Sequence, residues 1–288
     1  MQTIYLNGDY LPLNEAKISV LDRGFIFGDG VYEVIPVYAG KALRFEHHMQ
    51  RLQDSLDAIR IENPLSNNEW KNILDTLIAD TDSKHTTKQD QSIYLHITRG
   101  IAQRDHSFPQ DSKATVFIMS NILKPVDPEL LKTGVAAITL DDIRWKYCNI
   151  KAIALLPNIL LRQQAVDADA AEAILIREGS MTEGAASNAF IVSKGIIKTP
   201  PKSQNLLPGI TRDLVVEIAR QNKMPIEEVA ISEAEFLTAD EIWLTSSTKE
   251  ILPVTSINQQ TVGNGKPGPV WQEMYQKYQD YKEILRHN

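Results

Sequence analysis

Cysteine is almost absent from this sequence of 288 residues, because Cys148 is its single thiol. One cysteine cannot form an internal disulfide, so the fold does not require an oxidising compartment. The first residues also lack the basic segment and apolar core of a secretory signal peptide. No apolar run approaches the ~20 residues that a membrane-spanning helix needs. We therefore expect a soluble, cytoplasmic protein.

An excess of basic residues is lacking as well. Lys and Arg number 30 against 37 Asp and Glu, which gives a formal net charge of −7. Nucleic-acid binders usually carry a basic patch or stripe, so this balance argues against that class. A small anionic ligand held by a few local cations remains compatible with it. Hydrophobic residues make up 43% and charged residues 23%, an ordinary globular mixture that can bury a sizeable core.

The first 121 residues alternate short predicted strands with helices. Thr3–Leu6 and Tyr10–Leu11 flank Asn7-Gly8, a hairpin signal because both turn residues tolerate positive φ. Further strands are predicted over Val31–Tyr38, Ala42–Phe45, Ser92–Thr98 and Ala114–Ser120, and helices over Glu46–Arg60 and Asn67–Ile78.

Two prolines, Pro125 and Pro128, interrupt the pattern. We therefore expect an N-terminal α/β domain over residues 1–121, a linker over 122–134 and a C-terminal domain over 135–288. In the latter, strands are predicted over Val135–Leu140, Glu172–Ile176, Ala189–Val192, Ile226–Ile231 and Glu241–Thr245, and helices over Asn158–Asp167, Thr211–Asn222 and Gly268–Leu285. Strands mixed with helices in both parts indicate an α+β or α/β protein.

Lys151 is the first candidate for chemistry. It lies in the largely apolar stretch Asn149–Leu156, and a buried ammonium is costly unless it is paired or neutral. A desolvated lysine with a lowered pKa can form a Schiff base with an aldehyde. The alternative is a lysine that extends to solvent from the edge of a strand or helix. Taken alone, the residue favours this alternative.

Two further segments have the composition of a binding site. In Met181–Asn188, the acid Glu183 precedes small residues, which suits the ring nitrogen of a pyridine cofactor. In Leu207–Asp213, Gly209 and Thr211 precede a predicted helix whose first amides could bind phosphate. The alternatives are an ordinary turn and an ordinary capped helix. Thr245–Thr248 offers four hydroxyls, as either a plain loop or an oxyanion cup.

In order and spacing, these segments resemble the fold-type IV pyridoxal-phosphate enzymes, the class IV aminotransferases. Asp22–Glu33 adds the Arg-Gly…Phe-Gly-Asp-Gly pattern of that family, and the resemblance runs from about Ile4 to the last predicted helix. It implies a two-domain α+β fold. The smaller N-terminal domain is α/β, the larger C-terminal domain has a mixed, barrel-like sheet, and pyridoxal 5′-phosphate lies at the domain interface.

The resemblance assigns roles to three residues at the reacting centre. Lys151 matches the Schiff-base lysine, which also moves a proton between the substrate Cα and the cofactor C4′. Glu183 matches the acid that pairs with the pyridinium nitrogen. Tyr32 matches a tyrosine near the lysine and the substrate carboxylate, although a packed strand residue is its ordinary role.

Four more residues match the phosphate site of the family. Arg51 matches the arginine that holds the phosphate, where the alternative is a solvated helix face. Ile210 and Thr211 match the residues whose backbone amides complete the phosphate cup. Ser247 matches the residue that contributes a hydroxyl from the later loop.

Arg104 and His106 point to one branch of the family. Their spacing resembles the Arg-x-His pair of D-amino acid aminotransferases, which reaches in from the partner subunit and binds the substrate α-carboxylate. A guanidinium fork binds a carboxylate through two hydrogen bonds, and an imidazole adds another donor. A polar loop is the alternative. The pair implies a homodimer, while Pro36, Asp105 and Pro157 differ from the family pattern and bear on substrate range.

The leading hypothesis is transamination between a D-amino acid, such as D-alanine or D-glutamate, and a 2-oxo acid such as 2-oxoglutarate. Aminodeoxychorismate lyase and branched-chain L-amino acid aminotransferase are alternatives on the same scaffold. A non-catalytic binding protein is a further alternative, because fold alone does not guarantee activity. We expect no metal, nucleic acid or membrane partner.

Overall fold

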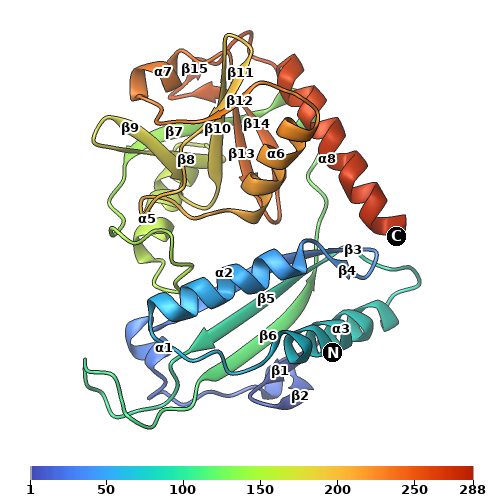
Figure 1. Ribbon diagram of the computed structural model, residues 1–288, viewed down its shortest axis with the longest axis vertical. Helices are drawn as coiled ribbons and strands as arrows, with labels where there is room; N and C mark the ends of the chain where they lie inside the picture. Colours follow the sequence, from blue (N-terminus) through green and yellow to red (C-terminus); the bar gives the residue numbers. More distant parts are fainter. Residues whose placement is uncertain (1, 288) are drawn as a thin grey trace. The chain divides into compact units, whose positions relative to one another are not determined.

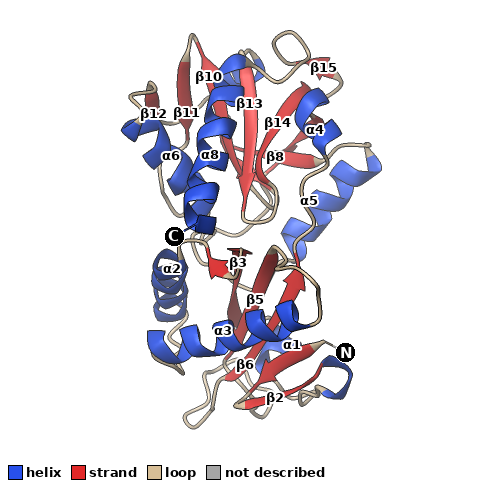
Figure 2. Ribbon diagram, turned by 90° about the vertical axis from the view of Figure 1, so that its right-hand side faces the viewer, coloured by secondary structure: helices blue, strands red, loops and turns tan. Residues whose placement is uncertain are grey.

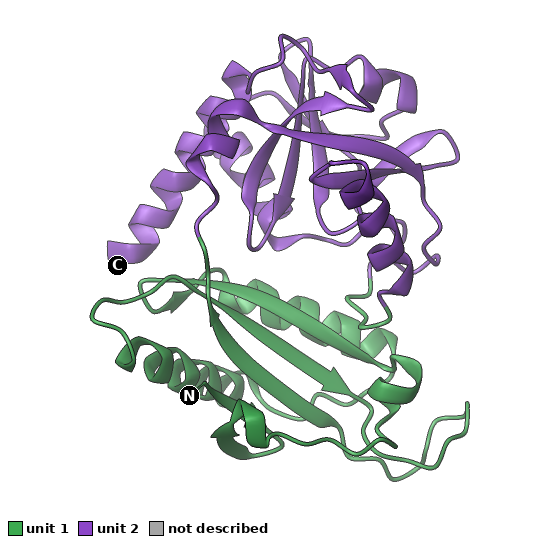
Figure 3. Cartoon of the chain, turned by 180° about the vertical axis from the view of Figure 1, so that it is seen from behind, with its two compact units in different colours: residues 1–124, 150–154, 288 green, residues 125–149, 155–287 purple. Residues whose placement is uncertain are grey.

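The computed structural model describes residues 2–287 and divides the chain into two compact units (Figure 3). Unit 1 comprises the residues up to Lys124 together with Ile150–Ala154. Unit 2 comprises Pro125–Asn149 and Leu155–His287, so it begins inside the predicted linker 122–134. That linker contains the short helix α4 (Pro128–Thr133), whose start is capped by the side chain of Asp127. The segment that carries Lys151 thus clusters with unit 1.

Unit 1 contains an antiparallel six-stranded sheet in the order β2-β1-β6-β5-β3-β4. Its strands are β1 (Thr3–Leu6), β2 (Asp9–Pro12), β3 (Gly30–Tyr38), β4 (Lys41–Ala42), β5 (Gln91–Thr98) and β6 (Thr115–Ile122). Its helices are the 3₁₀ turn η1 (Leu13–Glu15), α1 (Arg23–Phe27), α2 (Phe45–Ala58) and α3 (Asn67–Ser83). The Asn7-Gly8 hairpin is confirmed, with φ of 53° and 113°. The predicted strand Ala42–Phe45 is wrong beyond Ala42, because Arg44 adopts φ 52° and the chain enters α2.

Helices α2 and α3 cover one face of this sheet (Figure 1). Side chains alternate between the faces of a strand, so every second residue of β3 and β5 joins this core. The core includes Val31, Ile35, Ile93, Leu95 and Ile97 from the strands and Leu52, Leu56, Trp70, Leu74 and Leu77 from the helices. The opposite face presents Tyr32, Tyr94 and His96, which are half-buried. The residues between the core positions are therefore available to a ligand.

The described part of unit 2 forms a mixed nine-stranded sheet in the order β12-β11-β10-β13-β14-β7-β8-β9, with β15 beside β14. The strands are β7 (Val135–Asp141), β8 (Glu172–Arg177), β9 (Ser180–Gly184), β10 (Asn188–Ser193), β11 (Ile196–Thr199), β12 (Ile226–Glu228), β13 (Glu241–Ser246), β14 (Glu250–Ile257) and β15 (Gln260–Thr261). The pairs β7–β8, β7–β14 and β11–β12 are parallel, and the others are antiparallel. Sequence patterning missed β9, so Glu183 lies in a strand and not in a turn.

The sheet of unit 2 curls around one core and carries helices on its other face (Figure 2). The helices of this unit are α4, α5 (Leu156–Asp167), α6 (Ile210–Gln221), α7 (Glu233–Leu237) and α8 (Pro269–His287). Helices α6 and α8 pack against Phe190, Trp243 and Ile251. The inner core contains Ile242 and Leu244 of β13, and Phe236 of α7 closes it. Alternate residues of β13 thus serve two different cores.

Helix α8 begins at a buried acid. The carboxylate of Glu241 accepts hydrogen bonds from the backbone amides of Val270 and Trp271, at 3.0 Å and 2.8 Å. An acid there satisfies two first-turn amides and complements the helix dipole. Polar residues cover the outer side of α8, and Trp271 and Tyr278 face the core. Within residues 2–287, no helix combines the length and the apolar character needed to cross a membrane.

The core of unit 1 supplies a stability prediction. Leu52 of α2 is fully buried, so Leu52→Ala leaves a cavity and should lower the free energy of unfolding by about 2–5 kcal/mol. Gln50→Ala, on the exposed side of the same helix, should change it by less than about 0.5 kcal/mol. Urea denaturation followed by circular dichroism measures both. Equal effects of the two substitutions would contradict the assignment of the buried face.

Candidate active site

Lys151 is fixed by backbone contacts on both sides. The amide of Tyr32 donates to the carbonyl of Lys151 at 3.0 Å, and the amide of Ile153 donates to that of Gly30 at 3.1 Å. The amide of Lys151 donates to Ser55 Oγ of α2 at 3.2 Å. The segment is therefore attached to β3 and to α2, and the direction of the lysine side chain follows from these contacts.

The Lys151 amine has an aromatic neighbour and no competing anion. Its side chain is half-buried, and Nζ lies 4.2 Å from the centroid of the Tyr32 ring. Nζ makes no hydrogen bond or ion pair with any residue between 2 and 287. An ammonium over an aromatic face gains cation–π attraction without giving up a proton to a carboxylate. The amine remains available to a carbonyl ligand.

A buried carboxylate fixes the predicted phosphate-binding arginine. Glu33 of β3 is fully buried, and its two oxygens accept hydrogen bonds from Arg51 Nε and Nη2 at 2.8 Å and 2.7 Å. His48 Nδ1 lies 2.7 Å from the same carboxylate. His48 and Arg51 are three residues apart on α2, so they share one side of the helix. Two parallel hydrogen bonds fix the plane of the guanidinium.

The charge of this group is set by the competition between burial and pairing. Burial by itself raises the pKa of Glu33, but attraction and hydrogen bonds from Arg51, with His48, lower it well below its usual range. Burial lowers the pKa of His48, against the opposing effect of Glu33. Glu33 is therefore ionised at neutral pH, and it holds Arg51 as a cation.

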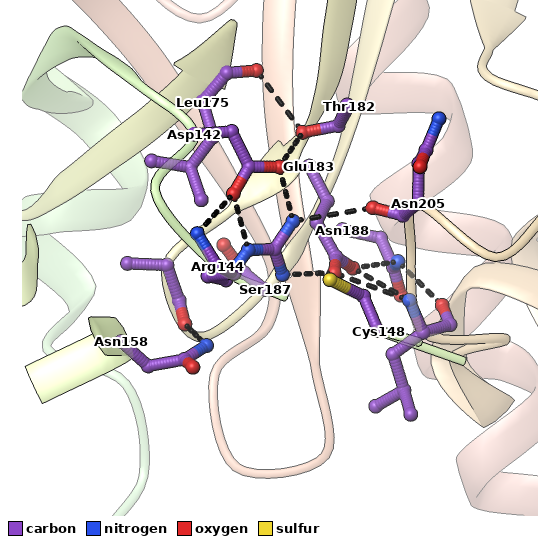
Figure 4. A network of polar contacts seen from close by, with 12 residues as sticks. Asp142, Arg144, Cys148, Asn158, Leu175, Thr182, Glu183, Ser187, Asn188 and Asn205 are labelled. Atoms are coloured by element: carbon purple, nitrogen blue, oxygen red, sulfur yellow. Dashed lines mark hydrogen bonds and ion pairs between the residues drawn. The ribbon is translucent and has the colours of Figure 1, made fainter. Parts of the chain in front are cut away.

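Glu183 occupies an equally organised position in unit 2 (Figure 4). Its carboxylate is buried and accepts hydrogen bonds from Arg144 Nη1 at 2.5 Å, Asn188 Nδ2 at 2.9 Å and the Leu207 amide at 3.1 Å. Arg144 is shared, because its Nε and Nη2 also donate to Asp142 at 2.9 Å. One guanidinium thus orients two carboxylates, and the position of Glu183 is fixed from three sides.

Burial and pairing act on Glu183 in opposite directions. Burial raises the pKa of Glu183 to about 7, although Arg144 and the Leu207 amide pull it down. Burial alone would lower the pKa of Arg144, but hydrogen bonds and attraction from Asp142 and Glu183 raise it above its usual range. Arg144 is consequently always charged. It is the cation that makes an ionised Glu183 tolerable in this environment.

Helix α6 begins without a side-chain cap. Its N-cap is Gly209, and a Cβ at that position would lie 1.9 Å from Asn188 Oδ1. Only glycine allows the chain to pass so close to Asn188. The amides of the first turn, those of Ile210 and Thr211 among them, have no partner inside a helix, and they favour an anion through the helix dipole. Both residues are buried.

A buried hydroxyl lies on the same side of the sheet as Asn188. Thr245 pairs directly with Asn188 across β13 and β10, so the two side chains share one face. Thr245 is 2% exposed, and its Oγ1 has no hydrogen-bond partner within residues 2–287. Leaving a buried hydroxyl unpaired is costly, so this atom indicates a ligand. Ser247 lies two residues further on, half-buried in the turn before β14.

Arg104 and His106 lie in the exposed loop between β5 and β6. The Arg104 Cζ atom lies 5.5 Å from the centroid of the Phe27 ring, and the His106 ring lies at the same distance from it. Phe27 therefore supports both predicted carboxylate binders. In all, unit 1 holds Tyr32, Arg51, Arg104, His106 and Lys151, and unit 2 holds Glu183, Ile210, Thr211 and Ser247.

Several partners of these residues were missed from the sequence. Glu33 and His48 stand in quoted motifs, but only the fold brings them to Arg51. The signal for Glu33 was a single acid in an otherwise apolar strand, and His48 and Arg51 have helical spacing. For Arg144, the signal was Asp142-x-Arg144 directly after a predicted strand.

Residues 30–257 match the sequence model of the amino-transferase class IV family. This chain belongs to the class IV aminotransferases. It is 39% identical to a D-alanine aminotransferase of Bacillus licheniformis over 267 residues, which cover 93% of this chain and 92% of the relative. It is 36% identical to a D-alanine aminotransferase of Staphylococcus haemolyticus, over 98% of this chain and 99% of the relative.

Solved structures confirm the predicted fold of this aminotransferase. The branched-chain amino acid aminotransferase of Escherichia coli superposes with a TM-score of 0.88 at 27% identity, covering 97% of this chain and 94% of that one. A branched-chain amino acid aminotransferase from T.th., solved with pyridoxamine 5′-phosphate, gives 0.88 at 26% identity, with 98% and 94% covered. A fold IV transaminase from Curtobacterium pusillum shares the fold at 22% identity, with a TM-score of 0.83 over 96% and 98%. The chain thus has fold type IV.

Arg144 supplies a prediction with a pH dependence. Arg144→Met leaves Asp142 and Glu183 buried without their cation, which should lower the free energy of unfolding by about 3–5 kcal/mol near pH 8. The pKa values of both carboxylates rise in the variant, so the penalty is present while they are ionised. As the pH falls toward 5 they take up protons, and the difference from the wild type should shrink.

Urea denaturation at pH 8 and pH 5 measures this difference. Lys202→Met is the matched control, because Lys202 is 52% exposed in its ion pair with Asp213. An exposed pair contributes at most about 1 kcal/mol. A loss in Arg144→Met no larger than in the control would contradict the role of Arg144.

Proposed function

We propose that this aminotransferase moves the amino group of a D-amino acid, such as D-alanine or D-glutamate, to a 2-oxo acid such as 2-oxoglutarate, with pyridoxal 5′-phosphate as cofactor. The half-buried amine of Lys151, beside Tyr32 and without a competing anion, carries this proposal. The D-alanine aminotransferases that are 36–39% identical over nearly the whole chain support the choice of amino donor. A cytoplasmic homodimer is part of the proposal.

The residues present fit the three parts of the cofactor. The aldehyde requires an amine, and Lys151 offers one. The ring nitrogen requires an acid, and Glu183 is a fixed carboxylate. The phosphate requires cations, free amides and hydroxyls. Arg51, the uncapped start of α6 at Ile210 and Thr211, and Ser247 supply these, and the unpartnered Thr245 Oγ1 adds one more donor.

When bound, the cofactor supplies an electron sink for the bond that breaks at the substrate Cα. Lys151 attaches the cofactor, and its freed Nζ then takes the proton from Cα and delivers it to the cofactor C4′. Tyr32 lies against Nζ and restricts the path of the amine. The backbone contacts of Lys151 to β3 and α2 keep the amine on one side of the reacting carbon. The chirality of the substrate is decided by that side.

The other residues hold ionised groups in place. Glu183 pairs with the ring nitrogen, and Arg144, Asn188 and the Leu207 amide keep its carboxylate from rotating. Glu33 fixes the guanidinium of Arg51 for the phosphate. Preorganised charges of this kind cost no reorganisation when the reaction occurs.

The substrate α-carboxylate falls to Tyr32, Arg104 and His106. We assign Arg104 and His106 of each protomer to the site of the partner subunit, as the resemblance implies. Both side chains are exposed in the isolated chain, where Phe27 supports them from one side. A guanidinium with a neighbouring imidazole matches a carboxylate in shape and charge.

The second candidate function is transamination of branched-chain L-amino acids. The observation that favours it is the superposition on branched-chain amino acid aminotransferases with TM-scores of up to 0.88. Identity to them is 26–27%, against 36–39% to the D-alanine aminotransferases. A shared fold alone does not decide the substrate.

A panel of enantiomers tests the amino donor. With 2-oxoglutarate as acceptor, D-alanine should yield pyruvate at least about a hundredfold faster than L-alanine, because the carboxylate and Cα positions are both fixed. Pyruvate is followed through lactate dehydrogenase. Product from L-leucine alone would establish the branched-chain alternative. Pyruvate released from aminodeoxychorismate without any oxo acid would establish the lyase.

Removal of the lysine amine tests the centre of the mechanism. Lys151→Ala should lower kcat at least about a thousandfold, because both cofactor attachment and proton transfer are lost. Lys132→Ala on α4, where the side chain is 73% exposed, is the matched control and should retain full activity. Thermal melting must give similar midpoints for both variants. Undiminished turnover in Lys151→Ala would refute the assignment.

A further inference from the structure

The loop that carries Arg104 and His106 is anchored where it leaves β5. Gly100 has φ 93°, and a Cβ there would lie 1.9 Å from the carbonyl oxygen of Lys113, so the two ends of the loop touch. The carbonyl of Gly100 accepts from the amide of Arg23 at 2.9 Å. Beyond this point, the residues from 103 to 108 are all exposed. An exposed loop is costly to order unless further contacts hold it.

One carboxylate supports the contacts that hold it. Asp29 Oδ2 accepts hydrogen bonds from Arg23 Nε and from Arg99 Nε, each at 2.8 Å, and Asp29 Oδ1 accepts from Arg99 Nη2 at 3.0 Å. Arg23 and Arg99 are 3% and 6% exposed. Burial raises the pKa of Asp29, but the hydrogen bonds and charges of Arg99 and Arg23 lower it overall. We call Arg23, Asp29 and Arg99 the arginine frame.

Arg23 connects this frame to the backbone around His106. Its Nη1 donates to the carbonyl of Asp105 at 2.6 Å and to that of Ser107 at 3.3 Å. These carbonyls belong to the residues on either side of His106. Its guanidinium also lies 4.8 Å from the ring centroid of Phe27, the ring that supports Arg104 and His106. A change in Arg23 therefore reaches the backbone and the aromatic support together.

Arg99 holds the far side of the loop. Its Cζ lies 3.7 Å from the centroid of the Phe108 ring, which is otherwise 51% exposed. Its Nη1 and Nη2 donate to the carbonyls of Arg60 and Ile59, at 3.0 Å and 2.6 Å, just beyond the end of α2. Arg99 is thus fixed by Asp29 and by the helix end, and its face is presented to Phe108.

We infer that Asp29, through Arg23 and Arg99, positions Arg104 and His106 for the α-carboxylate of the substrate. This inference rests on the proposed function, which assigns the carboxylate to Arg104 and His106. Loss of the frame allows the loop to move, so each carboxylate ligand must order it on binding, and affinity falls. The chemistry at Lys151 is untouched, since none of the frame residues contacts that amine. The frame residues are positioning residues.

The experiment compares carboxylate binding with turnover in the cofactor-loaded enzyme. Asp29→Asn keeps the size of the side chain but removes the charge that both arginines share. We expect it to raise KM for D-alanine and for 2-oxoglutarate about tenfold, with kcat within about twofold of the wild type. The inhibition constant of propionate, a carboxylate without an amino group, should rise by the same factor. Cofactor retention after gel filtration should not change.

Phe108→Ala is the second variant, because an exposed ring can be removed without unfolding the protein. Loss of its contact with Arg99 should raise both constants about threefold. Gln110→Ala, an exposed residue of the same loop, is the matched control and should leave them unchanged. If Asp29→Asn melts early, Phe108→Ala decides the question.

Arg104→Met separates the inference from the proposed function. If this variant leaves KM and the propionate constant unchanged, Arg104 does not bind the carboxylate, and both the assignment and the inference are overturned. If it raises them while Asp29→Asn and Phe108→Ala do not, only the inference is overturned. Loss of kcat or of cofactor in Asp29→Asn with an unchanged KM would also overturn it, because that is the result of a purely structural role.

Discussion

The pairing of the Lys151 segment with β3 is the contact on which the rest of the site depends. Five residues, Ile150–Ala154, join unit 1, while the chain before and after them belongs to unit 2. The hydrogen bond from the Tyr32 amide to the Lys151 carbonyl sets the register, and it places Nζ against the Tyr32 ring. A shift of one residue would turn the lysine to the opposite side of its segment. The reactivity of the amine is thus determined by backbone geometry.

Buried guanidinium–carboxylate pairs supply the remaining precision. Glu33 with Arg51, Glu183 with Arg144, and Asp29 with Arg23 and Arg99 each fix a charge that a flexible side chain could not hold. Replacing such a pair by apolar residues is often neutral or stabilising, so stability alone does not explain three of them. What they provide is orientation, because a guanidinium with two or more fixed acceptors cannot rotate. The site is therefore built from charges whose directions are set before any ligand arrives.

Periodicity predicted most elements of the fold, and spacing predicted the candidate residues, but neither gave the partners. The alternation in β5 and the Asn7-Gly8 turn are local signals, and they were read correctly. Strand β9 was missed, because Glu183 and its small neighbours lack an apolar alternation and become a strand only by pairing with β8. Arg144 is 39 residues from Glu183, and Arg23 is 82 residues from Asp105. Contacts at that separation depend on the fold, and a single sequence does not contain them as a pattern.

Reaction type and substrate choice depend on different parts of this aminotransferase. Lys151, Glu183 and the start of α6 lie on strands or a helix whose backbone is fixed by many hydrogen bonds, which suits the steps that every class IV aminotransferase shares. Arg104 and His106 lie on an exposed loop, where sequence can change without damage to a core. Such a loop gives selectivity only if it is rigid, because a mobile loop accepts ligands of several shapes. The arginine frame is the feature of this chain that reconciles an exposed loop with a fixed carboxylate site.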